Sequence, residues 1–155
     1  MKKYIVIMCM LFLFNYPVGA NVLSSIELER ERCLEENFQS DYTMSQCNYS
    51  ATEKCEVEII KLLNKMQKNN KKNDFSRILK AQKKWENYIK ISDSILNNLE
   101  NKYSLENQLL YSNIKYSNYK GRLSELFVID EILSNQKWIF NYHIFLWIFQ
   151  DVLND

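Results

Sequence analysis

Proline and glycine are scarce in this 155-residue sequence, which contains one proline and two glycines. β-Sandwiches and barrels built from short hairpins need these residues at their turns, although asparagine can serve some of them. Pro17 and Gly19 lie near the N-terminus, so Gly121 is the only such residue in the rest of the chain. A content of 46% hydrophobic and 14% aromatic residues is typical of one folded domain. These features predict an all-α protein.

Histidine is scarcer still, since His143 is the only one in the sequence. The chain has no G-x-S-x-G motif, no H-E-x-x-H motif and no phosphate-binding glycine-rich loop. A zinc site would need closely spaced cysteine and histidine ligands, and His143 is distant from the cysteines. Glutamates could pair as in a glycosidase, but charged helices contain them by default. We therefore predict that the protein is not an enzyme and has no catalytic residue, metal site or cofactor.

The first 20 residues have the three parts of a secretory signal peptide. Lys2 and Lys3 give a basic start, residues 4–14 form an uncharged apolar run, and residues 18–20 are small or compact. An uncleaved anchor is the alternative, but the apolar run has only about half of the ~20 residues that a bilayer core requires. The segment predicts cleavage after Ala20 and export to the periplasm or the cell exterior.

Acidic and basic residues nearly balance, with a net charge of +1 that becomes −1 when Lys2 and Lys3 are removed. A near-neutral protein has no general attraction to nucleic acid, so no such partner is predicted. The distribution is uneven, because residues 21–58 contain nine acids and three bases whereas residues 61–84 contain one acid and nine bases. Either these segments bind oppositely charged partners, or they form neighbouring helices that pair with each other.

Three cysteines remain after the predicted leader, namely Cys33, Cys47 and Cys55. An exported protein meets oxidising conditions, which favour disulfides over free thiols. Three cysteines allow one bridge and one spare thiol, and their spacing does not decide among the three pairings.

Hydrophobic periodicity predicts a small antiparallel helical bundle. A short helix is expected over residues 24–38 and a loop over 39–45. A longer helix over 46–67 has an apolar stripe, and a break follows at 69–73. Asp74 is the expected N-cap of the next helix, and a last helical region runs over 105–133. Because Gly121 disfavours helix, a bend or break is expected between Ser112 and Gly121. The residues expected on the apolar stripes of the two middle helices are Cys55, Ile59, Leu62, Leu63, Met66, Ile78, Ala81, Trp85, Tyr88, Ile95 and Leu99.

Residues 138–155 form a separate C-terminal segment, in which Trp138 to Phe149 reads WIFNYHIFLWIF. As a helix this run is too short to cross a bilayer. It is expected to form a fourth helix that caps the bundle, in which His143 is a packed side chain. The alternative is peripheral contact with a membrane or with a groove on a partner protein, although few lysines accompany the run.

The motif Ala81-Gln82-x-x-Trp85-x-x-Tyr88 resembles the signature of the LprI-type lysozyme-inhibitor family, which comprises small exported helical proteins. Cys33 and the stretch Thr43 to Cys47 are similar to the paired N-terminal cysteines of that family, and Arg122 with Leu126 matches its late R-x-x-x-L element. The resemblance covers about residues 33–133, within a predicted domain over residues 21–137. It implies a disulfide between Cys33 and Cys47.

The sequence departs from this family pattern at several positions. Ile89 stands where an arginine commonly follows the motif tyrosine, and Cys55 stands where alanine is common. A second disulfide would be expected at two positions that are Asp93 and Ile114 in this chain. Both cysteines are missing together, which indicates that the second bridge has been lost as a unit.

The motif residues also have a physical interpretation of their own. Ala81, Trp85 and Tyr88 are spaced i, i+4 and i+7, so they share one helix face and are expected to form a packing seam in the core. Gln82 and Arg122 are polar positions beside this seam and are expected to join their helices by hydrogen bonds. These are scaffold roles, and none of them explains inhibition.

The resemblance implies that the protein binds a lysozyme-type muramidase and blocks its cleft without catalysing a reaction. The acidic N-terminal segment could speed the encounter with a cationic enzyme. The alternative is a structural or interaction module of the envelope that docks through its aromatic C-terminal tail.

Overall fold

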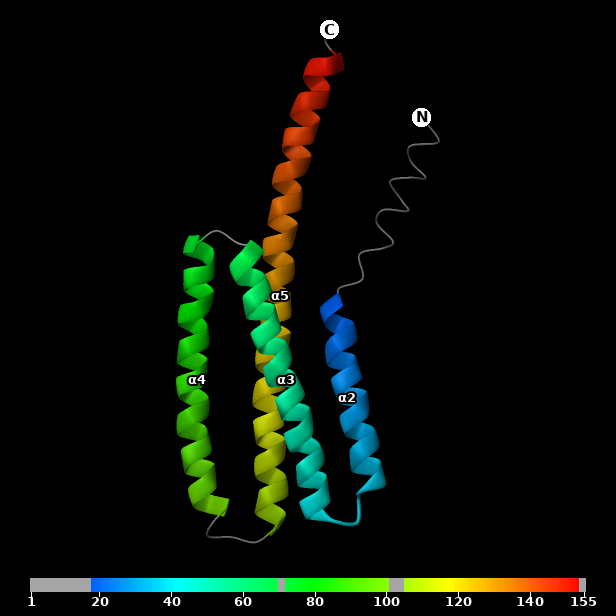
Figure 1. Cartoon of the computed structure of the whole chain (residues 1–155), viewed down its shortest axis with the longest axis vertical. Helices are drawn as coiled ribbons and strands as arrows, with labels where there is room; N and C mark the ends of the chain where they lie inside the picture. Colours follow the sequence, from blue (N-terminus) through cyan, green and yellow to red (C-terminus); the bar gives the residue numbers. More distant parts are fainter. Residues whose placement is uncertain (1–17, 70–71, 101–104, 154–155) are drawn as a thin grey trace.

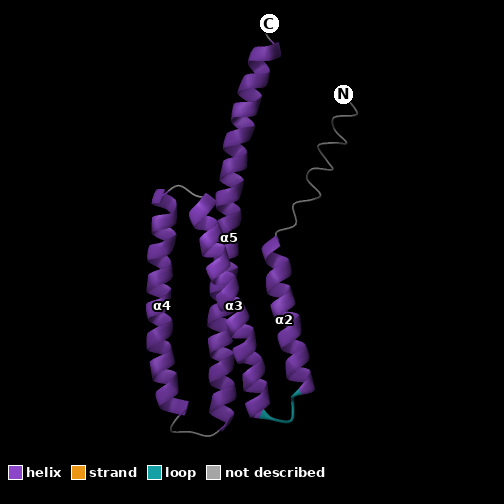
Figure 2. Cartoon of the chain, in the orientation of Figure 1, coloured by secondary structure: helices purple, strands orange, loops and turns teal. Residues whose placement is uncertain are grey.

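The structure is a computed structural model that describes residues 18–69, 72–100 and 105–153, with side chains over 21–69, 73–97 and 107–135. Its helices are α2 (Val18–Glu36), α3 (Asp41–Asn69), α4 (Lys72–Glu100) and α5 (Leu105–Leu153). No strand occurs in these described ranges (Figure 2). The predicted all-α fold is confirmed. Residues 1–17 of the predicted signal peptide lie outside the described residues.

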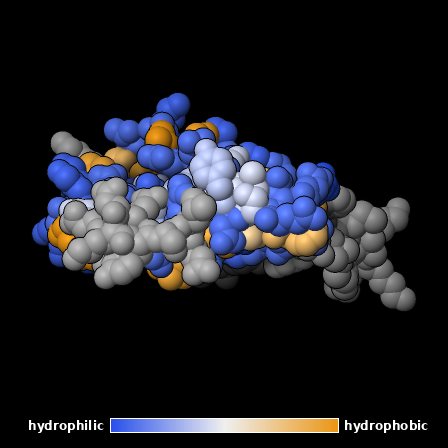
Figure 3. Space-filling view, turned by 90° about the horizontal axis from the view of Figure 1, so that it is seen from below, coloured by the Kyte–Doolittle hydropathy of each residue, from blue (hydrophilic) through white to orange (hydrophobic). Residues whose placement is uncertain are grey.

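Successive helices run in opposite directions, so the bundle is antiparallel as predicted (Figure 1). α5 packs along α3, and α2 covers both of them, whereas α4 packs mainly against α5. The interior is apolar, and the end that holds the α2–α3 loop shows mostly hydrophilic side chains with small separate hydrophobic patches (Figure 3). The core consists of Ile26, Ala51, Cys55, Ile59, Leu62, Met66, Ile78, Tyr116, Leu123 and Leu126.

The loop that was predicted over 39–45 is much shorter, because α3 already begins at Asp41. Ser40 caps this helix: its hydroxyl accepts a 3.4 Å bond from the Thr43 backbone N–H, and its carbonyl accepts one of 2.9 Å from Met44. A serine at this position satisfies N–H groups that the first helical turn leaves free. The polar composition of 39–45 therefore belongs to a helix start. Asp74, the expected N-cap of the next helix, instead lies inside the first turn of α4.

The helix does not break between Ser112 and Gly121, since α5 is continuous from Leu105 to Leu153. Gly121 is exposed, and a Cβ at this position would meet nothing within 4 Å. The helical cost of one glycine is about 1 kcal/mol. Burial of the neighbouring Leu123 and Leu126, both at 0% exposure, outweighs that cost.

Residues 138–153 continue α5, so the expected separate capping helix is wrong. This part of α5 projects past the ends of α3 and α4 (Figure 1). Among the described residues, no helix combines the length and the apolar character that crossing a bilayer requires.

A disulfide joins Cys33 of α2 to Cys47 of α3, with their Cα atoms 5.7 Å apart, and Cys55 is a buried free thiol. The predicted pairing is confirmed. The bridge closes the α2–α3 hairpin over a sequence separation of 14 residues. Closing a loop of this size contributes about 3 kcal/mol in the chain-entropy treatment of the unfolded state. The disulfide therefore fixes the C-terminal end of α2 to the N-terminal part of α3.

A polar network joins α2, α3 and α5 beside this disulfide. The Arg30 guanidinium donates to the side-chain oxygen Oδ1 of Asn48 at 2.7 Å and to Oδ1 of Asn113 at 2.9 Å. The Asn48 side-chain amide nitrogen donates to the Ser112 hydroxyl at 3.0 Å. The Arg30 guanidinium also lies 4.4 Å from the centroid of the Tyr116 ring. Buried polar groups are stabilising when they are paired in this way. The network fixes the register of the three helices.

Tyr116 differs from its neighbours in this network, because its buried hydroxyl has no hydrogen-bond partner among the described residues. Burial raises the pKa of Tyr116 to about 12, and the nearby Cys55 and Glu27 act in the same direction. A buried hydroxyl without a partner costs desolvation free energy that a phenylalanine would not.

We therefore expect Tyr116→Phe to leave the free energy of unfolding at neutral pH unchanged or to raise it by up to about 1 kcal/mol. The folded-state pKa lies above the unfolded value of about 10, so wild-type stability is fully present below pH 10 and is lost as the pH rises toward 12. Urea unfolding at pH 8 and pH 11 should show a smaller alkaline loss for Tyr116→Phe than for the wild type. Tyr88→Phe, at an exposed tyrosine, serves as the control. An equal alkaline loss in Tyr116→Phe and the wild type would contradict this assignment.

Candidate binding groove

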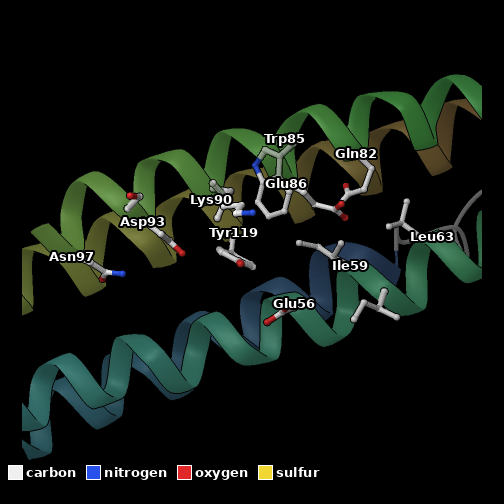
Figure 4. A pocket seen from close by; sticks show the side chains of 13 residues that line it. Glu56, Ile59, Leu63, Gln82, Trp85, Glu86, Lys90, Asp93, Asn97 and Tyr119 are labelled. Atoms are coloured by element: carbon white, nitrogen blue, oxygen red, sulfur yellow. The ribbon is translucent and has the colours of Figure 1, made fainter.

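An open groove of about 680 Å³ lies between α3 and α4, with α5 at its back (Figure 4). It exists because α4 packs on α5 and makes few contacts with α3. The two walls come from α3 and α4, and one residue of α5 lies between them. The lining residues are Glu56, Ile59, Ile60, Leu63, Gln82, Trp85, Glu86, Ile89, Lys90, Asp93, Ser94, Asn97 and Tyr119.

Two aromatic rings form the floor of the groove. Trp85 of α4 and Tyr119 of α5 meet edge to face, with ring centroids 5.0 Å apart and planes at 80°. Such pairs contribute roughly 0.5–1.5 kcal/mol beyond the burial of their area. Both rings are only partly buried, so they attach α4 to α5 and still present aromatic surface to the groove.

The predicted packing seam of Ala81, Trp85 and Tyr88 is only partly correct. Ala81 is exposed and Tyr88 has an exposed fraction of 56%, whereas Trp85 is partly buried. The buried face of α4 is instead formed by Ile78, Gln82 and Ile89. The apolar pattern missed this rotation because it followed apolar residues alone and placed Gln82 beside the seam, whereas Gln82 is itself buried. Ile95, another residue of the expected apolar face, is also exposed.

Gln82 can be buried because Arg122 satisfies it. The Arg122 guanidinium Nε–H donates to Gln82 Oε1 at 2.9 Å, which confirms the hydrogen bond predicted between these helices. Arginine can only donate, so the Gln82 oxygen faces Arg122 and the Gln82 amide nitrogen is free to donate to Glu86 Oε1 at 3.0 Å. Arg122, which is 5% exposed, thereby positions a carboxylate of the groove through Gln82.

Carboxylates from both walls surround Tyr119. Burial raises the pKa of Tyr119, and the negative charges of Glu56, Asp93 and Glu86 raise it further. Lys90 is the only cation among the lining residues. The lining therefore has three carboxylates and one cation.

Asp93 has a second role, because its carboxylate lies 3.3 Å from the Lys115 ammonium of α5. The family pattern would place a cysteine at Asp93 and at Ile114, next to Lys115 in the chain. In this protein the Asp93–Lys115 ion pair joins α4 to α5 at these positions. Exposed ion pairs contribute about 0–1 kcal/mol, less than a disulfide.

Among the described residues, the one ion pair between the acidic and basic segments is Glu58–Lys61 within α3, at 2.6 Å, and none joins them across helices. Glu27 of α2 pairs with Lys120 of α5, and Glu29 of α2 pairs with Lys54 of α3. The described cations on the exposed surface of α4 have no ion pair within the described part of the chain; they are Arg77, Lys80, Lys83, Lys84 and Lys90. In the described part of the chain, the predicted pairing of the two oppositely charged segments as neighbouring helices is therefore wrong.

Sequence reasoning identified Trp85, Gln82 and Arg122 but missed the acidic lining and Tyr119. Periodicity did place Ile59 and Leu63 together on α3. No signal in the sequence indicated that α4 would stand away from α3, and this separation creates the groove.

Removing the Gln82 side chain should destabilise the protein, because it leaves the buried Arg122 Nε–H without its acceptor. We expect Gln82→Ala to lower the free energy of unfolding by about 1–3 kcal/mol. The neighbouring Lys83→Ala, at an exposed position of the same helix, should change it by less than about 0.5 kcal/mol. Urea denaturation of the three proteins measures both values, and equal changes in the two variants would refute the role of Gln82.

In comparisons with known proteins, no family model, curated protein or solved structure matches this chain. The resemblance to the LprI-type family therefore remains a prediction from the motif residues. The groove between α3 and α4 is the feature of the described structure best suited to binding a partner, since it combines exposed aromatic surface with an excess of one charge.

Proposed function

We propose that the protein is exported and binds a lysozyme-type muramidase, whose activity it lowers by covering the substrate cleft. The observation that carries the proposal is the groove with the Trp85–Tyr119 floor, placed on the helices that contain the family-like motif. A muramidase of this type needs a protonated and an ionised carboxyl group in its cleft. A protein that covers these groups needs no catalytic residue of its own.

Two further features support the proposal. The Cys33–Cys47 disulfide is of a kind that persists in oxidising compartments, where a muramidase would meet the cell wall. Glu31, Glu35 and Glu36 of α2 are exposed and have no ion pair among the described residues. Such a cluster would speed association with a cationic enzyme, and added salt would weaken this effect.

The geometry suggests how binding would proceed. The groove would receive a segment from the rim of the enzyme's cleft, and Trp85 would be the central contact because partly exposed aromatic residues dominate binding energies. The flanking surfaces of α3 and α4 would then lie across the cleft. Substrate entry would be blocked without any chemical step in the inhibitor.

Titration of a lysozyme with the purified protein should show inhibition at micromolar concentrations. We expect Trp85→Ala to weaken inhibition by at least about tenfold, because a central aromatic contact contributes roughly 2 kcal/mol or more. Tyr88→Ala, in the same motif but outside the groove, should change it by less than about threefold. Circular dichroism of both variants verifies that they are folded. Absence of inhibition by the wild type, or equal losses in the two variants, would count against the proposal.

The second candidate is an interaction module that docks through the C-terminal segment, and one observation favours it. α5 carries residues 138–153 beyond the ends of α3 and α4 (Figure 1). The run from Trp138 to Phe149 is apolar and aromatic. Helices of this composition bind membrane surfaces or partner proteins.

The two candidates need different parts of the chain. Under the second, deletion of residues 138–155 should abolish co-sedimentation with phosphatidylglycerol–phosphatidylethanolamine vesicles, and full-length protein should bind them. Under the first, the same deletion should leave lysozyme inhibition within about twofold of the wild type, since the groove lies in residues 56–119. If the full-length protein does not co-sediment with the vesicles, docking of the C-terminal segment to a membrane is excluded.

A further inference from the structure

We infer that the groove between α3 and α4 is a receptor for the guanidinium group of an arginine side chain on an exposed loop of a partner protein. This inference deepens the proposed function and rests on it for the identity of the partner. The proposed occupant of the groove is a cation, and the evidence for it is the charge and the shape of the lining residues.

The first step is the location of unpaired negative charge. Glu56 of α3 and Glu86 of α4 stand on opposite walls of the groove (Figure 4). Neither carboxylate has an ion-pair partner among the described residues, in contrast to Asp93, which pairs with Lys115. Lys90 is the one lining cation, so the walls retain an excess of negative charge.

The second step is the surface beneath these carboxylates. The Trp85 and Tyr119 rings lie between the two walls (Figure 4), and Ile59 and Ile89 also line the groove. A guanidinium plane stacks on an aromatic face and is attracted by its electron density. Its N–H groups can at the same time donate to carboxylates at its edge. The groove offers both contacts to one group.

The third step is the choice between arginine and lysine. A guanidinium is planar, weakly hydrated and has five donors, whereas an ammonium is compact and strongly hydrated. An aromatic floor with carboxylates on two sides fits the plane and the donor fork of arginine. A lysine would satisfy one carboxylate and lose more hydration on entry.

The fourth step is preorganisation. The Arg122–Gln82–Glu86 chain of hydrogen bonds, at 2.9 Å and 3.0 Å, restrains the Glu86 carboxylate before any partner arrives. A restrained acceptor loses less side-chain entropy on binding. The buried Arg122 is therefore a positioning residue for the groove.

Other occupants fit the lining less well. The apolar face of a helix from a second copy would bury Glu56 and Glu86 without a cation, which is costly. Phosphate groups of a lipid or a nucleic acid would be repelled by the same carboxylates. Charge complementarity selects a cationic group.

The test is an NMR titration of the disulfide-bonded protein with N-acetyl-arginine amide, with N-acetyl-citrulline amide as the neutral control of similar shape. The Trp85 indole N–H and the Gln82 side-chain amide should shift saturably with the arginine probe. Binding of the citrulline probe should be at least about tenfold weaker, because a hydrogen bond between charged groups exceeds a neutral one. Equal affinity for the two probes, or no shift at these groups, would overturn the inference.

Matched variants locate the effect. Glu56→Gln/Glu86→Gln should weaken binding of the arginine probe by at least about fivefold, whereas Glu31→Gln/Glu35→Gln on α2 changes the net charge equally and should leave it within about twofold. Equal losses in both double variants would indicate general electrostatic attraction and overturn the inference. Shifts at Trp85 that depend on protein concentration without any probe would indicate a second copy in the groove, with the same consequence.

The probe experiment tests the inference about the groove, and the enzyme assay tests the proposed function, so either can give a negative result without the other. If the protein binds the arginine probe but no lysozyme, the proposed function is wrong and the groove serves another arginine-bearing partner. If it inhibits a lysozyme but Glu56→Gln/Glu86→Gln inhibits as well as the wild type, inhibition does not use this groove and the inference is wrong.

Discussion

The groove depends on the buried hydrogen bond between Arg122 of α5 and Gln82 of α4. A buried guanidinium is tolerated only when it is paired; Glu125 supplies its ion pair within α5, and Gln82 supplies the acceptor from the neighbouring helix. The bond fixes which face of α4 turns toward α5. That choice brings Trp85 over Tyr119 and leaves Glu86 at the groove, so one polar contact in the interior determines the chemistry of the surface.

The bundle consists of a tightly packed part and an attached helix. α2, α3 and α5 supply all of the apolar core except Ile78 of α4; the Arg30 network joins these three helices, and the disulfide joins α2 to α3. α4 is held largely by specific contacts with α5, which are the Gln82–Arg122 bond, the Trp85–Tyr119 ring pair and the Asp93–Lys115 ion pair. A helix attached along one neighbour leaves its other flank unfilled. The space between α4 and α3 is therefore a consequence of how α4 is attached.

Much of the fold could be predicted from residue types and spacing. The scarcity of glycine and proline excluded hairpin folds, and the three- and four-residue spacing of Cys55, Ile59, Leu62 and Met66 identified a helix face that is buried. The errors have local causes. A polar stretch that starts a helix resembles a loop until the Ser40 cap is considered, and an exposed Gly121 weakens a helix less than packing strengthens it.

The sequence by itself determined that the chain forms antiparallel helices with apolar stripes, because helical periodicity and turn-forming residues act over short distances along the chain. Only the tertiary structure decided that α4 turns Gln82 inward and Tyr88 outward, and that Glu56, Glu86 and Tyr119 from three helices meet at one groove. These choices depend on contacts between residues about 30 to 60 positions apart, whose energies are comparable across several rotations of a helix. No local pattern selects among such rotations, whereas one buried donor and its acceptor do.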